Sequence, residues 1–349
     1  MPVTKTKETD YKGKEIITCR LVNTKGTSVT ITNYGAIIMS LVYPLRNGNT
    51  SDLVLGFEKP EDYFSPAYLG LEANPYFGAV IGRFANRIKR GQFSIDGQPY
   101  QLAQNLPPEH LHGGREGFDK KVWDLQFLTD TPFPQVGLQY ISPAGEEGYP
   151  GALVAQVRYE LNDQDELTIE YSGTTDSPTL FNPTNHSYFN LDGKNGNVKD
   201  HVLRIPAPVI LEQDEYYTPT GNLIRVEDSI YDFREPKKLG RDWHPEKGYD
   251  QSFVVDPDFN HAAAEIFSPA SGIRMEVFST SPMIHLYTGS GIKNIAGKNG
   301  QVYEAFAGFS LETQIHPNGI NLSNFPDSIL RPGEKFSSRT RYRFTQDPD

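Results

Sequence analysis

Residues 153–172, LVAQVRYELNDQDELTIEYS, decide the fold class because they contain two alternating runs on either side of a polar turn. In the first run, apolar side chains occupy every second position from Leu153 to Leu161, with mostly polar side chains between them. Residues 167–172 repeat this pattern after the turn-forming residues 162–165. A period of two is typical of a strand with one buried face. The stretch therefore predicts a β-hairpin.

Two further hairpins are visible on either side of this stretch. Residues 93–102 contain the dipeptide Asp96-Gly97, which suits a tight turn with positive φ between two short alternating runs. In residues 265–277 the alternation is broken only by the turn-forming residues 269–272. The recurrence of hairpins along the chain indicates an all-β fold.

The sequence offers no long amphipathic helix, and its 31 glycines and 26 prolines interrupt a helical framework too often. We expect only short helical turns, near residues 66–74 and 292–297. A length of 349 residues fits one domain or two. Residues 232–250 are rich in aromatic side chains, and we interpret them as a long loop with a binding role. The composition of the chain is the same on both sides of this loop. We therefore expect one domain, residues 1–349, built as a large antiparallel sandwich.

The charge balance excludes some classes of partner. Forty-four acidic residues outnumber 33 lysines and arginines, and the net charge of −11 argues against nucleic acid or an anionic membrane surface. Cys19 is the only cysteine, so the chain can form no intrachain disulfide and no multi-thiolate metal site. The first residues lack the apolar stretch of a secretory signal, and no apolar run approaches 18 residues. We expect a cytoplasmic protein with a neutral or cationic small ligand.

The densest polar and aromatic segment is residues 181–193, FNPTNHSYFNLDG, with His186 at its centre. This density predicts a lined pocket in which the imidazole takes part. The alternative is that His186 is a core histidine whose ring is satisfied by a carbonyl group.

Two segments earlier in the chain offer further candidates. In Leu111-His112-Gly113-Gly114 the glycines let the backbone approach a ligand closely, and His112 can reach over them. Asn86 and Arg87 could donate to sugar hydroxyls, although an arginine is more often part of a surface ion pair. His110 and His112 would share a face in a strand, but without an HExxH motif or a nearby carboxylate pattern we expect no metal site.

Two carboxylates complete the candidates. Asp250 follows Gly248 and Tyr249 and could accept hydrogen bonds from two vicinal hydroxyls, or could be a simple turn residue. Glu312 lies among apolar neighbours in residues 309–314 and could point inward from a sheet edge, or could be an exposed strand residue.

Together these segments resemble the aldose 1-epimerase (galactose mutarotase) family in order and spacing, from about residue 15 to about residue 345. The NPTNHSYFNL segment is the most specific part of this resemblance. The motifs that carry it are RFANRI at 83–88, LHGG at 111–114, NPTNHSYFNL at 182–191, GYD at 248–250 and LETQ at 311–314.

The resemblance implies a β-supersandwich with its active site in a cleft on one sheet. It implies that His186 is the general acid and Glu312 the general base. The residues that it implies for holding the sugar are Asn86, Arg87, His112, Asp250 and also Ser187 and Tyr188. His285 stands where the family commonly has glutamine, which alters one expected hydroxyl contact.

The implied reaction interconverts the α and β anomers of a free aldohexose such as galactose or glucose. It opens a hemiacetal, for which one acid and one base on opposite sides of the ring suffice and no cofactor is needed. Histidine and glutamate, with ordinary pKa values of about 6.5 and 4.3, suit these roles. Two alternatives remain open: a glycoside hydrolase using Asp250 and Glu312, and a non-catalytic sugar-binding protein on the same fold. The protein is expected to act as a monomer or a homodimer.

Overall fold

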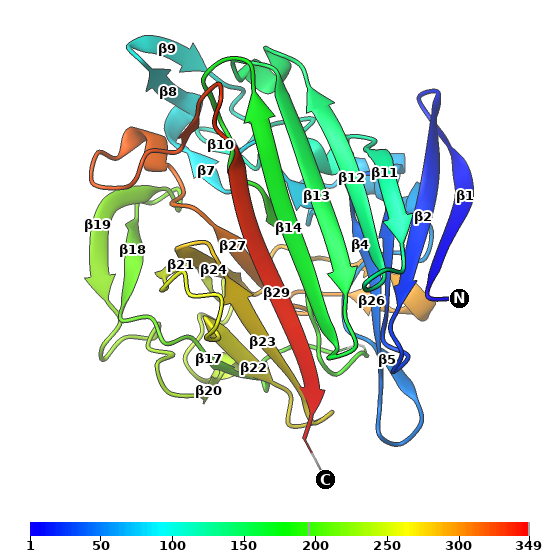
Figure 1. Cartoon of the computed structure of the whole chain (residues 1–349). Coiled ribbons are helices and arrows are strands. Elements are labelled where there is room, and N and C mark those ends of the chain that lie inside the picture. Colours follow the sequence, from blue (N-terminus) through cyan, green and yellow to red (C-terminus); the bar gives the residue numbers. More distant parts are fainter. Residues whose placement is uncertain (195, 348–349) are drawn as a thin grey trace.

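The computed structural model describes residues 1–194 and 196–347; residue 195 and the last two residues of the expected 1–349 domain lie outside this part. The largest element is a sheet of nine strands, every neighbouring pair of which is antiparallel. The long strand β29 runs through its middle, between β14 and β23 (Figure 1). The strand order is β11 (Asp124–Thr129), β12 (Gln135–Ser142), β13 (Leu153–Leu161), β14 (Glu166–Thr175), β29 (Phe336–Gln346), β23 (Ile273–Ser279), β22 (Ala264–Phe267), β17 (Val202–Arg204) and β20 (Lys237–Lys238).

Two five-stranded sheets accompany it. The first lies at the N-terminus and consists of β1 (Val3–Tyr11), β2 (Lys14–Val22), β3 (Ser28–Thr32), β4 (Ile38–Pro44) and β5 (Thr50–Asp52). The second has the order β19 (Pro219–Arg225), β18 (Val209–Gln213), β21 (Asp250–Val254), β24 (Met283–Tyr287) and β27 (Ser310–Gln314).

The structure also contains five two-stranded ribbons among the described residues. They are β10 (His110–Leu111) with β7 (Arg87–Ile88), β15 (Thr179–Leu180) with β28 (Ile329–Leu330), β16 (Thr184–Asn185) with β6 (Val80–Ile81), β25 (Ile295–Ala296) with β26 (Val302–Tyr303), and β8 (Gln92–Ile95) with β9 (Gln98–Gln101).

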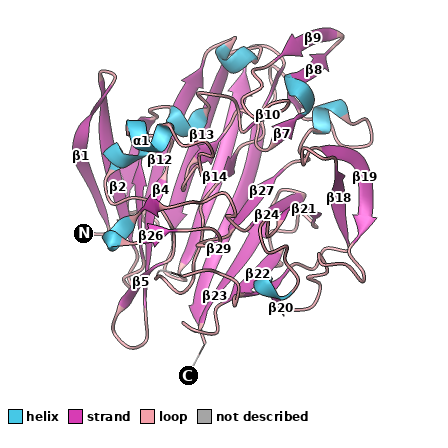
Figure 2. Ribbon diagram, turned by 180° about the vertical axis from the view of Figure 1, so that it is seen from behind, coloured by secondary structure: helices cyan, strands magenta, loops and turns pink. Residues whose placement is uncertain are grey.

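Helical segments are short and lie within the connecting loops (Figure 2). The α-helix α1 has four residues, Pro66–Leu69. The 3-10 turns are η1 (Pro60–Phe64), η2 (Lys89–Gly91), η3 (Phe118–Lys120), η4 (Glu146–Gly148), η5 (Leu239–Arg241), η6 (Lys298–Gly300) and η7 (Gly319–Asn321). None of the helices in the described residues is long and apolar enough to cross a membrane.

One apolar core joins the three large sheets. Leu21 of β2, Leu153 of β13 and Leu286 of β24 belong to the same buried cluster, which extends to Phe344 of β29. Burial alternates along β13, so that one of its faces packs inward, whereas the residues of β24 from Met283 to Leu286 are all buried, on both faces of the strand. This β-supersandwich confirms the expected all-β class.

The three expected hairpins are confirmed as β13–β14, β8–β9 and β22–β23. The helical turn expected near residues 66–74 is α1. The turn expected at residues 292–297 is wrong, because Ile295 and Ala296 pair with β26 and the helical turn follows as η6. Apolar residues between glycines do not distinguish a helical turn from a two-residue strand.

Candidate active site

Three neighbouring strands, β21, β24 and β27, form the floor of the candidate site. Their antiparallel register places Ser252, His285 and Glu312 side by side in one row. Asp250 lies two positions before Ser252 and therefore on the same face of the sheet. The alternate residues of these strands point to the opposite face of the sheet. On that face, Phe253 and its neighbours on the adjoining strands belong to the apolar core. Strand alternation thus brings two carboxylates and an imidazole from distant parts of the sequence to one surface.

His186 enters this surface from the segment that follows β16. Its backbone N–H donates to the carbonyl of Ala79, and its side chain is buried. The Nε2 atom lies 3.5 Å from Oε1 of Glu312, while Nδ1 has no hydrogen-bond partner among the described residues. The ring therefore makes no hydrogen bond to a carbonyl group in the part of the chain that the structure describes. This contradicts the alternative interpretation of His186 as a core histidine satisfied by a carbonyl. An unpaired buried polar atom is uncommon and indicates a ligand.

Asn86 and His112 are held together in an unusual backbone conformation. Their φ angles are 62° and 52°, in the left-handed region that residues other than glycine rarely adopt. The backbone N–H of Asn86 donates to Nδ1 of His112 over 3.1 Å, and the backbone N–H of His112 donates to the carbonyl of Asn86 over 3.0 Å. Such backbone strain concentrates at functional sites.

The protonation state of His112 follows from these contacts. Burial lowers the pKa of His112 well below its ordinary value, and the neighbouring side chains of His186 and Arg87 lower it further. The ring is therefore neutral near pH 7. Because Nδ1 accepts a hydrogen bond from Asn86, the proton must be on Nε2. His112 presents an N–H donor to the site, which suits a hydroxyl oxygen.

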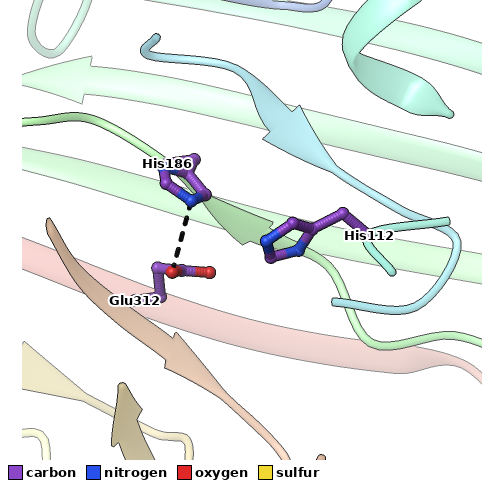
Figure 3. Close-up of side chains that lie close together, drawn as sticks. All are labelled: His112, His186 and Glu312. Atoms are coloured by element: carbon purple, nitrogen blue, oxygen red, sulfur yellow. Dashed lines mark ion pairs between the residues drawn. The ribbon is translucent and has the colours of Figure 1, made fainter. Parts of the chain in front are cut away.

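His112, His186 and Glu312 converge from three segments of the chain (Figure 3). One ligand atom of each lies within 4.8 Å of the others, which is close enough to hold a metal ion. The donor set fits a metal poorly, however, since Nδ1 of His112 already accepts a hydrogen bond and Nε2 carries the proton. The site favours hydrogen bonding over metal coordination.

Arg87 and Asp250 form a second charged pair at this surface. Nη2 of Arg87 lies 3.5 Å from Oδ2 of Asp250, and the Arg87 guanidinium lies over the ring of Tyr217. Burial acts to raise the pKa of Asp250, but Arg87 and His285 outweigh it and lower this pKa to about 2. Asp250 is therefore ionised throughout the neutral range and can only accept hydrogen bonds.

These groups line one cleft with a volume of about 620 Å³. Of the residues predicted from the sequence, those that line it are Asn86, Arg87, His112, His186, Tyr188, Asp250, His285 and Glu312. Ser187 does not line the cleft, and its side chain is buried. Such a cleft, with a few convergent polar groups, is typical of a site for a small ligand.

Comparison with known proteins assigns the chain to a family. A family model described as aldose 1-epimerase matches residues 18–343. The chain belongs to the aldose 1-epimerase family. It is 42% identical over 325 residues to the galactose mutarotase of Homo sapiens, covering 91% of each chain. It is 34% identical over 334 residues to the aldose 1-epimerase of Escherichia coli strain K12, covering 93% of this chain and 94% of that one.

Solved structures of aldose 1-epimerase relatives share the fold. An aldose epimerase homologue from C. elegans matches with a TM-score of 0.86 at 32% identity, over 94% of this chain and 98% of that one. A galactose 1-epimerase from Lactobacillus acidophilus matches with a TM-score of 0.85 at 27% identity, over 99% of both chains.

Arg83 of the RFANRI motif and His110, which precedes the LHGG motif, have structural positions outside the cleft. Arg83 is 2% exposed, and the five N–H groups of its guanidinium lie within hydrogen-bond distance of six acceptors, in residues 142–151 and in Thr179. Nδ1 of His110 lies 2.7 Å from the carbonyl oxygen of Ala103, and Nε2 lies 2.7 Å from the hydroxyl of Tyr149. The strand that contains His110 ends before His112, so the two rings do not share a face.

The sequence analysis missed several residues of the site. Tyr76 lines the cleft with a φ of 56°, and its ring centroid lies 5.0 Å from that of His112 and 5.7 Å from that of His186. Glu246 and Lys247 of the long loop also line the cleft, which gives a role to residues 232–250. The Gly after Phe77 marks the turn near Tyr76, but no sequence signal places the Tyr76 ring against two histidines.

Proposed function

We propose that His186 and Glu312 carry out the reaction of this aldose 1-epimerase, the interconversion of the α and β anomers of a free aldohexose such as galactose or glucose. The observation that carries this proposal is the contact of 3.5 Å between Nε2 of His186 and Oε1 of Glu312 at the base of the cleft. Both groups have a further buried atom without a partner, Nδ1 of His186 and Oε2 of Glu312, among the described residues.

The closeness of the two groups fits the geometry of ring opening. Glu312 removes the proton of the C1 hydroxyl while His186 protonates the ring oxygen; both of these oxygens are bonded to C1. The two side chains lie side by side, with 3.5 Å between Nε2 of His186 and Oε1 of Glu312. After rotation about the C1–C2 bond, His186 takes back its proton and Glu312 returns the other one as the ring closes.

Asn86, Arg87, His112 and Asp250 hold the rest of the sugar in this proposal. Arg87 and the neutral His112 supply N–H donors, and the ionised Asp250 supplies acceptors. Tyr188 forms part of the wall, because its ring lies 5.0 Å from that of His186. We propose that residues 1–349 act as one domain.

The lowered pKa of Asp250 excludes this residue as the general acid of a glycoside hydrolase. Such an enzyme needs one carboxyl group that stays protonated to act as the acid, whereas Asp250 is paired with Arg87 and His285 and has a pKa of about 2. A sugar-binding protein without activity would need no acid–base pair. The family match is to an isomerase.

Polarimetry tests the proposal directly. Freshly dissolved α-D-galactose and α-D-glucose should relax to equilibrium faster with catalytic amounts of the protein than in buffer. The His186→Ala variant, as a matched control, should lose this acceleration. If the wild-type protein accelerates neither sugar, the proposed substrate is wrong.

A further inference from the structure

A buried serine and histidine lie behind Asp250. Oγ of Ser252 lies 2.8 Å from Nδ1 of His285, and Nε2 of the same ring lies 2.9 Å from Oδ1 of Asp250. Ser252 and His285 face each other across strands β21 and β24 and are 1% and 3% exposed. The three side chains thus form a chain of contacts that ends at a sugar-facing carboxylate.

The contacts determine the orientation of the imidazole ring. The carboxylate of Asp250 can only accept, so Nε2 of His285 carries a proton towards it. When this is the only proton on the ring nitrogens, Nδ1 is an acceptor, and the hydroxyl of Ser252 donates to it. A ring turned by 180° would present carbon atoms to both partners. Ser252 therefore fixes which nitrogen faces Asp250.

Asp250 keeps its capacity to bind a hydroxyl despite this contact. Nε2 of His285 lies 2.9 Å from Oδ1 of Asp250 and Nη2 of Arg87 lies 3.5 Å from Oδ2, so each carboxylate oxygen keeps a lone pair for a hydroxyl. The imidazole stabilises the carboxylate electrostatically and leaves lone pairs free. Both ring nitrogens of His285 face protein groups, so this side chain has no nitrogen left for the sugar.

We propose that Ser252 and His285 are positioning residues that hold Asp250 in the orientation that accepts a sugar hydroxyl. The proposal rests on the function proposed above. The pair then sets the affinity for the sugar and leaves the proton transfers to His186 and Glu312. His285 thus acts through Asp250, whereas the sequence predicted that it contacts a sugar hydroxyl directly. The role of Ser252 was not predicted from the sequence.

Steady-state mutarotation kinetics of three variants test the proposal. His285→Leu removes the donor and should raise KM about tenfold, with kcat changed by less than about twofold. Ser252→Ala should raise KM by roughly two- to fivefold. His285→Gln should keep KM within about threefold of wild type, because an amide has both a donor for Asp250 and an acceptor for Ser252. Met283→Leu on the same strand is the matched control and should change neither constant.

A double variant separates positioning from direct sugar binding. In the Asp250→Asn background, His285→Leu should raise KM no further, because the group that it positions is already altered. Additive effects on KM would overturn the proposal, as would a drop in kcat at unchanged KM in Ser252→Ala and His285→Leu. A wild-type protein without mutarotase activity, or Asp250→Asn with unchanged KM, would instead contradict the function on which the proposal rests. Thermal unfolding of each variant identifies those that fail to fold.

Discussion

Nε2 of His186 lies 3.5 Å from Oε1 of Glu312, although the two residues are 126 positions apart in the sequence. His186 follows the short strand β16, while Glu312 lies within β27. The contact between these strands brings the two groups together at the base of the cleft. This arrangement leads to separate expectations for chemistry, binding and stability.

Replacement of Glu312 by glutamine should reduce kcat by about 10²- to 10⁴-fold and leave KM nearly unchanged, because the amide keeps the shape but cannot take the proton. Polarimetry over a range of galactose concentrations measures both constants. Glu304→Gln is a matched control, since Glu304 is exposed and does not line the cleft. Near-normal turnover in Glu312→Gln would make the assignment of the base wrong.

Replacement of Asp250 by asparagine should chiefly raise KM, by roughly 10- to 100-fold, because a charged acceptor is lost and Arg87 is left without its partner. The turnover number should fall much less. The same polarimetric assay gives both values. Unchanged kinetics would remove Asp250 from the sugar-binding residues.

Asp250 should also make stability depend on pH. Its pKa in the folded protein is about 2, below the ordinary 3.8. A carboxylate with a lowered pKa stabilises the folded protein fully at pH values above its unfolded-state pKa. This stabilisation is lost as the pH falls towards 2. The contribution is roughly 2 kcal/mol. In urea unfolding between pH 5 and pH 2, the free energy of unfolding should fall more steeply with decreasing pH for wild type than for Asp250→Asn. Equal slopes of this free energy against pH would contradict the expectation.

Tyr76 should matter through its ring and not through its hydroxyl. Because the ring contacts both His112 and His186, Tyr76→Ala should admit water to these imidazoles and lower kcat/KM about tenfold. Tyr76→Phe should stay within about twofold of wild type. The pH profile of kcat/KM should shift in Tyr76→Ala alone. Equal losses in both variants would instead assign the effect to the hydroxyl.

The two arginines of RFANRI should separate stability from binding. Arg83→Lys should lower the free energy of unfolding by about 3 kcal/mol, because an ammonium group cannot replace a buried guanidinium that lies within hydrogen-bond distance of six acceptors. The folded fraction should keep its KM. Arg87→Lys should raise KM with a smaller effect on unfolding. The reverse pattern in chemical denaturation and kinetics would contradict these roles.

Local sequence patterns predict the hairpins and the segments of the site because both depend on neighbouring residues. The alternation in residues 153–172 appears unchanged as β13 and β14. His186 and Glu312 could be predicted from motif order alone. The short distance between the two side chains could not be predicted, since it depends on how β16 packs against β27.

Features that depend on register and backbone strain could not be predicted. Ser252 contacts His285 only because β21 and β24 pair in one specific register. The positive φ values of Tyr76 and His112 arise from tertiary contacts, and tyrosine and histidine carry no local signal for them comparable to that of glycine. The structural role of Arg83 likewise depends on carbonyl groups some 60 residues away.

The central position of β29 in the nine-stranded sheet has a consequence for biosynthesis. This strand contains residues Phe336–Gln346, yet it separates β14 from β23 and pairs with both. Domains usually fold in order as the chain leaves the ribosome. Here the two halves of the sheet must wait, each with an unpaired edge, until β29 has left the ribosome. A nascent chain that stalls before β29 emerges therefore exposes two unpaired strand edges, and we expect it to depend on chaperones that shield them.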